Sequence, residues 1–164
     1  MLFSHPRDFT PTCTTELGQL QKRKGEFDKR GVAVAALSVD TAEHHAGWIK
    51  DINEVAGVEV SFPIFADTDY AISLAYGMVD QTHLSQATGM PFTVRSVFFI
   101  GPDGKVKALL SYPASTGRSF TEILRVLDSL QLTAKHSVAT PADWTQGGKC
   151  VVLPTISTED ALKK

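Results

Sequence analysis

The sequence predicts an α/β domain built around a mixed central sheet. Short apolar runs rich in β-branched residues alternate along the chain with segments in which apolar residues recur at helical spacing. The turn sequence Pro102-Asp103-Gly104 separates two of these runs, which predicts an antiparallel hairpin within the sheet. With 164 residues, of which 43% are hydrophobic and 21% charged, the chain is long enough for one well-buried core.

Four segments are expected in the first part of the chain. The run from Met1 to Phe3 predicts a strand, and the apolar spacing that follows Pro11 predicts a helical stretch that ends before Gly31. Residues 32–37 are small and β-branched, which is typical of a strand buried on both faces. A helix then runs from an N-cap at Asp40 to a stop at Gly57. Its apolar face is expected to contain Trp48, Ile49, Ile52 and Val55.

The second part of the chain is expected to alternate in the same way. Strands are predicted at residues 62–65, 96–100 and 106–112, with a short helix over residues 70–76. The capping box Ser119-x-x-Glu122 opens a further helix. Its apolar face is expected to contain Phe120, Ile123, Leu124, Leu127 and Leu130. A strand-like run over residues 150–153 and a polar tail come last.

Composition and charge exclude several classes of protein. The 16 basic and 18 acidic side chains leave a formal charge of −2, which gives no pull toward nucleic acid or anionic membranes. The longest apolar run, residues 32–37, is far shorter than the ~20 residues that span a membrane, and the first residues lack a signal-peptide pattern. The two cysteines, Cys13 and Cys150, are too few for a disulfide framework. We therefore expect a soluble, cytoplasmic protein that binds no nucleic acid.

The richest chemistry in the sequence lies around Cys13. Pro6 and Pro11 keep the preceding stretch out of a regular helix, so Cys13 falls in or just before a first helical turn. Unpaired backbone N–H groups and the positive end of the helix dipole favour the thiolate there, and the thiolate is the reactive nucleophile. The alternative is a small apolar filler, because free cysteine is often buried. Position alone leaves both interpretations open.

Several other cysteine chemistries do not fit the residues present. A Cys-x-x-Cys dithiol is missing because the third residue after Cys13 is Glu16, and a phosphatase loop is missing because its arginine position holds Gln19. His44 and His45 are adjacent rather than four residues apart, so they do not share a helix face as two metal ligands would. We expect no metal site. A cysteine protease with a histidine base stays open on these counts.

A motif upstream of Cys13 points to one chemistry. The spacing Pro6-x-x-x-Thr10-x-x-Cys13 resembles the active-site signature of the peroxiredoxins, and residues 5–11 are similar to the one-cysteine branch, the peroxiredoxin-six type. Similarity to the same branch continues at residues 89–95 and 98–104, at 111–132, at 139–144 and at 152–154. The resemblance therefore covers nearly the whole chain.

The resemblance implies a thioredoxin-like fold in three layers around the mixed sheet. It implies a peroxidase domain at residues 1–132 and the start of a C-terminal extension at residues 133–164. The strands that usually open the family are expected to be missing, which fits either a fragment or a shortened protein. A Gly-x-Ser-x-Gly-like segment linked to phospholipase activity would lie there too. Asp103 matches the third phospholipase residue, but alone it gives that activity no support.

The resemblance also implies how the site would act on a peroxide. Cys13 is the nucleophile, and Thr10 offers its hydroxyl to the peroxide. Arg95 donates hydrogen bonds to the sulfur and the peroxide and favours the thiolate, while Pro6 shields the pocket from water.

Three further residues are expected to support this site. Glu16 is expected to orient Arg95, Arg118 to lie near the active site, and His5 to stand beside Pro6. No cofactor and no metal are implied.

The implied function is a thiol-dependent peroxidase that reduces hydrogen peroxide and organic hydroperoxides, lipid hydroperoxides included, through a sulfenic acid. Cys150 lacks the neighbours of a resolving cysteine and is expected to be a buried filler in a strand. An external thiol, glutathione or a thioredoxin-like donor, would then close the cycle. A homodimer is expected. Two other functions stay open: a holdase-type chaperone that does not need Cys13, and a thioredoxin-fold binding module without catalysis.

Overall fold

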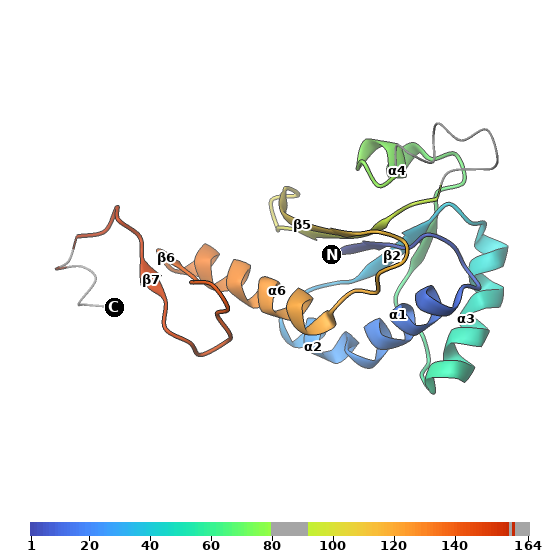
Figure 1. Cartoon of the computed structure of the whole chain (residues 1–164), viewed down its shortest axis with the longest axis horizontal. Coiled ribbons are helices and arrows are strands. Elements are labelled where there is room, and N and C mark those ends of the chain that lie inside the picture. The colour runs from blue at the N-terminus through green and yellow to red at the C-terminus, as the bar shows by residue number, and fades with distance from the viewer. Residues whose placement is uncertain (80–91, 158, 160–164) are drawn as a thin grey trace. The chain divides into compact units, whose positions relative to one another are not determined.

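A computed structural model describes residues 1–79, 92–157 and 159 of the chain (Figure 1). The chain divides into two compact units, Met1–Arg118 and Ser119–Lys164, and each is described by itself below. The domain boundary expected after residue 132 stays a prediction. Of the similarity at residues 89–95, positions 89–91 lie outside the described residues.

The first unit contains a five-stranded mixed sheet in the order β3-β2-β1-β4-β5. The strands are β1 (Leu2–Ser4), β2 (Ala35–Ser38), β3 (Ile64–Ala66), β4 (Arg95–Ile100) and β5 (Val106–Tyr112). The strands β1, β2 and β3 are parallel, whereas β4 is antiparallel to both β1 and β5. The predicted hairpin and the mixed sheet are therefore confirmed.

The described residues of this unit form four helices: α1 (Pro11–Lys22), α2 (Lys24–Lys29), α3 (Ala42–Ala56) and α4 (Ala71–Ala75). The helices α1 and α3 lie side by side (Figure 1). Trp48 and Ile52 of α3 and Leu17 and Leu20 of α1 are at most 1% exposed, so they form the core of this layer. Because α1 begins at Pro11, Cys13 lies in its first turn. The packing of α1 on α3 therefore fixes the position of Cys13.

The contact between α1 and α3 leaves no room for a side chain at Gly18. A Cβ atom there would lie 2.6 Å from the Cβ of Ala56. We expect Gly18→Ala to destabilise the fold by about 1–3 kcal/mol through this overlap. Gly25→Ala in α2 is the matched control, because a Cβ there meets nothing within 4 Å. Gly18 lies in the interior of α1, where alanine is favoured over glycine, whereas Gly25 is the second residue of the short helix α2 and gains less. A midpoint of urea denaturation for Gly18→Ala equal to or above that of Gly25→Ala would therefore contradict the close packing.

Several predicted boundaries were wrong. The helical stretch before Gly31 is two helices, separated at Arg23, whose φ of −100° and ψ of 2° interrupt α1. The second strand starts at Ala35 rather than Val32, because its pairing with β1 begins where Leu2 lies opposite Ala35.

The predicted N-cap of α3 was also wrong. The N-cap is Thr41, whose side chain accepts a hydrogen bond from the His44 N–H. Asp40 instead accepts a hydrogen bond from the Asp8 N–H.

Val55 was wrongly assigned to the core, since it is 69% exposed. The side of α3 that faces α1 continues from Trp48 and Ile52 to Ala56, which packs at Gly18. Val55 lies seven residues after Trp48 and therefore points to a similar side of the helix. It belongs to the last turn of α3, however, where its side chain stays exposed.

The second unit contains α6 (Phe120–Lys135), β6 (Val138–Ala139) and β7 (Val151–Val152), with the two strands antiparallel. The predicted cap is confirmed, since the Ser119 side chain accepts a hydrogen bond from the Glu122 N–H. Trp144 is 5% exposed, and its indole N–H donates to the Gly148 carbonyl at 3.1 Å. Among the described residues, no helix combines the length and the apolar character that crossing a membrane requires.

Candidate active site

Cys13 lies in the first turn of α1. Thr10 is the N-cap with extended backbone angles, and Pro11 occupies the first turn, where its missing N–H costs nothing. Cys13 is fully buried and no acidic side chain lies in this turn. Backbone N–H groups and the helix dipole therefore stabilise negative charge at the sulfur.

Arg95, the first residue of β4, contacts the sulfur directly. Its Nη1 lies 3.3 Å from the Cys13 Sγ and donates to the Glu16 Oε2 at 2.6 Å. Its Nε donates to the Ala114 carbonyl at 2.9 Å, which fixes the plane of the guanidinium. The side chain is buried, so its charge acts on the sulfur with little screening by water.

Glu16 joins two arginines at the site. Besides Arg95, it receives hydrogen bonds from Arg118 at 2.8 Å (backbone N), 3.0 Å (Nε) and 2.9 Å (Nη2). Burial raises the pKa of Glu16, but the charge and hydrogen bonds of Arg118 and the charge of Arg95 outweigh burial, so the pKa lies below its ordinary value. Two cations and one anion leave a net positive charge next to the Cys13 sulfur.

Arg118 holds this group against the sheet. Its Nη1 donates to the carbonyl of Ser4 at 2.8 Å and to that of Ser96 at 3.0 Å. It therefore ties Glu16 to the neighbouring strands β1 and β4. Arg95 and Glu16 are both buried, so neither is a surface charge.

Thr10 and Pro6 lie in the segment between β1 and α1. The Thr10 hydroxyl donates to the Arg7 carbonyl at 3.0 Å, and the Thr10 carbonyl accepts from the Thr14 N–H at 3.0 Å. Pro6 is buried, whereas Thr10 is half-buried. The structure thus brings both predicted residues to the start of the helix that carries Cys13.

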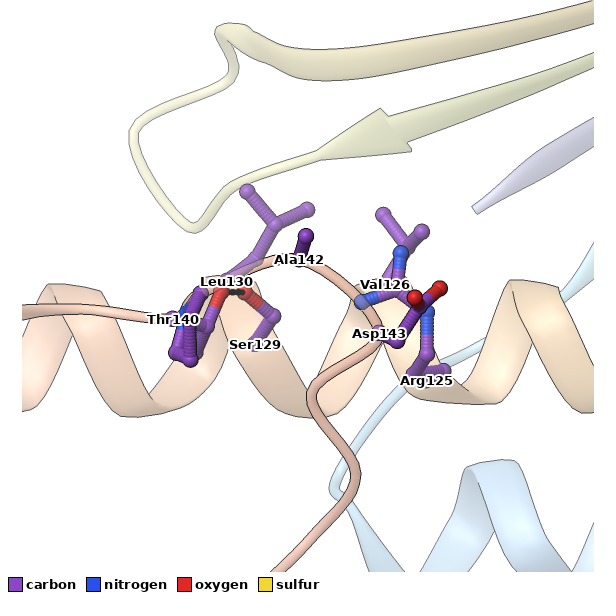
Figure 2. A pocket seen from close by; sticks show the side chains of 8 residues that line it. Arg125, Val126, Ser129, Leu130, Thr140, Ala142 and Asp143 are labelled. Carbon is purple, nitrogen blue, oxygen red and sulfur yellow. Dashed lines mark hydrogen bonds between the residues drawn. The ribbon is translucent and has the colours of Figure 1, made fainter. Parts of the chain in front are cut away.

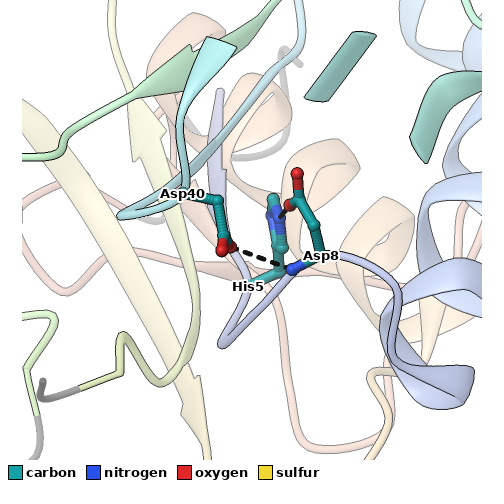
Figure 3. A group of neighbouring side chains, drawn as sticks. All are labelled: His5, Asp8 and Asp40. Atoms are coloured by element: carbon teal, nitrogen blue, oxygen red, sulfur yellow. Dashed lines mark hydrogen bonds and ion pairs between the residues drawn. The ribbon is translucent and has the colours of Figure 1, made fainter. Parts of the chain in front are cut away.

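His5 belongs to a buried group that sequence reasoning missed. Its Nε2 lies 2.8 Å from the Asp8 Oδ1, and the His45 Nδ1 lies 2.6 Å from the Asp8 Oδ2. Asp40 adds a carboxylate oxygen that accepts the Asp8 N–H at 2.9 Å (Figure 3). The only signal in the sequence was the pair His5 and Asp8 beside the motif. Nothing local links it to His45, which lies 37 residues from Asp8.

Ligand atoms of His5, Asp8 and Asp40 lie within 4.8 Å of one another, close enough to share a metal ion. Hydrogen bonds already engage them, however. Each Asp8 carboxylate oxygen faces an imidazole nitrogen, and the Asp40 Oδ2 accepts from the Asp8 N–H and the Ser38 hydroxyl. A hydrogen-bonded group explains these distances, and we assign it no metal.

The second unit has a pocket of its own, of about 300 Å³ (Figure 2). Arg125 is the basic side chain in its wall, and Glu122 already pairs with that guanidinium at 2.6 and 2.8 Å. Ser129 and Thr140 in the wall bond to each other at 2.7 Å. None of the predicted site residues lines this pocket.

Cys150 does not match its predicted environment. It lies just before β7 rather than within it, and it is only half-buried. Its sulfur contacts the Gly148 carbonyl at 3.8 Å. The predicted buried filler is therefore wrong, because β7 has only two residues and leaves position 150 in the connecting loop.

Comparisons with known proteins agree with this geometry. The AhpC/TSA family model matches residues 1–109, and a model of the C-terminal domain of 1-Cys peroxiredoxin matches residues 129–164. The chain belongs to the one-cysteine peroxiredoxin family. The family resemblance and the thioredoxin-like fold expected from the sequence are confirmed, and peroxiredoxins are thiol peroxidases.

Individual peroxiredoxins match over nearly the whole chain. It is 52% identical to 1-Cys peroxiredoxin of Dictyostelium discoideum over 99% of this chain and 66% of that protein. It is also 52% identical to peroxiredoxin-6 of Rattus norvegicus, over 98% of this chain and 73% of that protein.

Two solved structures are similar as well. A mutant of the peroxiredoxin 6 of Arenicola marina has a TM-score of 0.93 at 52% identity, over 99% of this chain and 74% of that one. A yeast mitochondrial 1-Cys peroxiredoxin has a TM-score of 0.88 at 43% identity, over 99% of this chain and 78% of that one. Thiol resolution in the yeast protein proceeds via glutathione and thioredoxin systems.

Proposed function

We propose that this peroxiredoxin reduces hydrogen peroxide and organic hydroperoxides, lipid hydroperoxides included, with Cys13 as its only redox-active thiol. The observation that carries the proposal is the 3.3 Å contact between the Arg95 guanidinium and the Cys13 sulfur, inside a buried group with net positive charge. A thiolate is the species that such a site stabilises. Family membership supports the same reaction.

In the proposed step the Cys13 thiolate attacks one peroxide oxygen, and the O–O bond breaks. The sulfur loses two electrons and becomes a sulfenic acid, while the other oxygen takes a proton and leaves as water or an alcohol. Arg95 donates to the sulfur and to the developing charge on the oxygens. The Thr10 proton is engaged by the Arg7 carbonyl, so its oxygen can accept the peroxide O–H. Pro6 limits access of water.

Two external thiols would complete the cycle. The first condenses with the sulfenic acid and releases water, and the second displaces Cys13 from the mixed disulfide. Glutathione or a thioredoxin-like protein fits this role, in line with the systems that serve the yeast relative. We place the enzyme in the cytoplasm, where such thiols are kept reduced.

The test follows peroxide consumption by the full chain with dithiothreitol, with glutathione and with thioredoxin plus its reductase. We expect turnover with at least one of them, and Cys150→Ser should have the rate of the parent protein. A Cys150→Ser variant that turns over only once would contradict the one-cysteine cycle, because it would make Cys150 the resolving thiol.

We also propose that the enzyme is a homodimer joined at β5. This strand is the last of the described sheet, and Val106 and Leu109 on it are each 50% exposed. An edge strand with exposed apolar side chains is a natural site for pairing with a second copy. Light scattering should give the mass of a dimer for the parent protein and a monomer for Leu109→Lys. A monomeric parent would refute this assembly.

A further inference from the structure

Asp8 lies buried between two imidazole rings that come from different elements. The Nε2 of His5, just after β1, is 2.8 Å from one carboxylate oxygen. The Nδ1 of His45, on α3, is 2.6 Å from the other. His5 is fully buried, and Asp8 and His45 are each 3% exposed. We call these three residues the His-Asp-His group.

The partners of this group fix how many protons it holds. The second nitrogen of His45, Nε2, lies 3.2 Å from the Phe65 carbonyl, which is only an acceptor. An ionised Asp8 is likewise only an acceptor. Both nitrogens of His45 must therefore carry hydrogen for both contacts to be hydrogen bonds, which makes His45 an imidazolium. His5 donates from Nε2 to the remaining carboxylate oxygen, and its Nδ1 has no hydrogen-bond partner among the described residues.

The titration behaviour of the three groups agrees with this proton count. Burial lowers the pKa of His45, but the hydrogen bond and charge of Asp8 outweigh it, so the pKa lies above its ordinary value. Burial raises the pKa of Asp8, yet the two imidazoles bring it below its ordinary value. For His5, burial prevails over Asp8 and the pKa is lowered, so this ring is neutral.

The group is built into the segment that starts the catalytic helix. The backbone N–H of Asp8 donates to the Asp40 carboxylate beyond β2. The next residue, Phe9, has a φ of 57°. This backbone conformation is unfavourable for a residue with a bulky side chain, so the surrounding structure must hold it in place. Thr10, the N-cap of α1, comes directly after it. Asp8 therefore anchors the strained turn that delivers the Thr10 hydroxyl.

A second path connects the group to Cys13. The His5 ring lies against the Trp48 ring, with centroids 4.9 Å apart. The Trp48 indole N–H donates to the Thr14 hydroxyl at 3.0 Å, and Thr14 follows Cys13 in the first turn of α1.

We propose that Asp8 and His45 are positioning residues for peroxide reduction, which fix the segment from His5 to Thr10 through the hydrogen bonds that Asp8 makes with the two imidazoles. The inference rests on the proposed peroxidase function. It gives a role to Asp8, which the resemblance left without one, and adds His45, which lies outside the motif. Both act through the geometry of Thr10 and the start of α1, since neither contacts the sulfur. Misplacement by about 1 Å can cost about 100-fold in rate.

Two variants of the full chain separate positioning from bulk stability. Asp8→Ala removes both acceptors, and we expect kcat/KM for hydrogen peroxide to fall by roughly 10- to 100-fold. In Asp8→Asn the amide oxygen accepts from His5, and the amide N–H donates to a neutral His45. All the hydrogen bonds survive with one proton fewer, so we expect this variant to recover most of the rate. Asp28→Ala, on the exposed surface of α2, is the control and should match the parent.

The pH profile gives a readout that a purely structural role would not move. His45 is faced by Asp8, by the Phe65 carbonyl and by the charge of Asp40, and its ring centroid lies 6.2 Å from that of His5. The two acceptors require the proton on His45. Because the pKa of His45 is raised, this proton is lost only at a higher pH than in an ordinary imidazole. The parent protein should then lose rate on the alkaline side, and Asp8→Asn should lack this decline.

Nitrogen-15 NMR of the imidazoles should show His45 doubly protonated at pH 7 in the parent protein and singly protonated in Asp8→Asn. A parent protein without peroxidase activity would refute the proposed function, and the NMR result would still report on the proton. With an active parent, an undiminished rate in Asp8→Ala would overturn the inference. So would an unchanged alkaline limb, or a doubly protonated His45, in Asp8→Asn.

Discussion

Cys13→Ser is expected to abolish catalytic peroxide consumption, with a loss on the order of 10⁴-fold or more. A serine hydroxyl holds its proton at neutral pH, so the positive charge of Arg95 and the start of α1 have no thiolate to stabilise. Serine nearly matches cysteine in volume, so the fully buried position should still pack. The measurement is the initial rate of peroxide loss with an excess of the reductant that supports the parent protein.

The matched control for this experiment is Cys150→Ser, which removes the other free thiol. It should retain the parent rate. Equal rates for Cys13→Ser and the parent protein would contradict a thiol peroxidase and would favour the holdase or the inactive binding module, neither of which needs this thiol.

Glu16→Ala is expected to cause the largest loss of stability, about 3–5 kcal/mol. The carboxylate is the shared partner of Arg95 and Arg118, and both guanidinium groups are buried. Without it, two like charges stay in the interior with unpaired donors. Glu122→Ala is the control, because its partly exposed pair with Arg125 should contribute about 1 kcal/mol or less. Urea denaturation followed by circular dichroism measures both; equal losses would contradict the assigned role.

The same carboxylate makes stability depend on pH. Its pKa is lower in the folded protein than in the unfolded chain, because Arg118 and Arg95 outweigh the cost of burial. The stabilisation is therefore fully present above the unfolded value of about 4.3 and is lost as pH falls toward the folded pKa. Denaturation midpoints of the parent protein should drop below about pH 4.5, and Glu16→Gln should show a smaller drop. Identical acid profiles would refute this explanation.

Local signals predicted the parts of the fold that local interactions determine. The turn at Pro102-Asp103-Gly104 and the capping box at Ser119 both form as expected. The boundaries that failed depend on distant partners. The start of β2 is fixed by its pairing with Leu2, and the buried side of α3 is fixed by Gly18 on another helix. Neither partner can be recognised from the segment itself.

The site shows the same division. The start of a helix pointed to Cys13 as a possible nucleophile. The family resemblance added Thr10 and Glu16, which are close to it in sequence, and Arg95, which lies 82 residues from Cys13. Neither local position nor the family resemblance pointed to a role for His45. Its link to Asp8 exists only because α3 returns beside the segment after β1, so the His-Asp-His group appeared only in the structure.

The decisive experiment for the one-cysteine cycle is the identification of the product formed with one equivalent of hydrogen peroxide in the absence of reductant. The full chain would be treated with peroxide in the presence of dimedone, which traps sulfenic acids, and then digested for mass spectrometry. We expect a dimedone adduct on Cys13, with Cys150 still a free thiol. A disulfide between Cys13 and Cys150, or an adduct on Cys150 alone, would contradict the assignment of Cys13 as the only redox-active thiol.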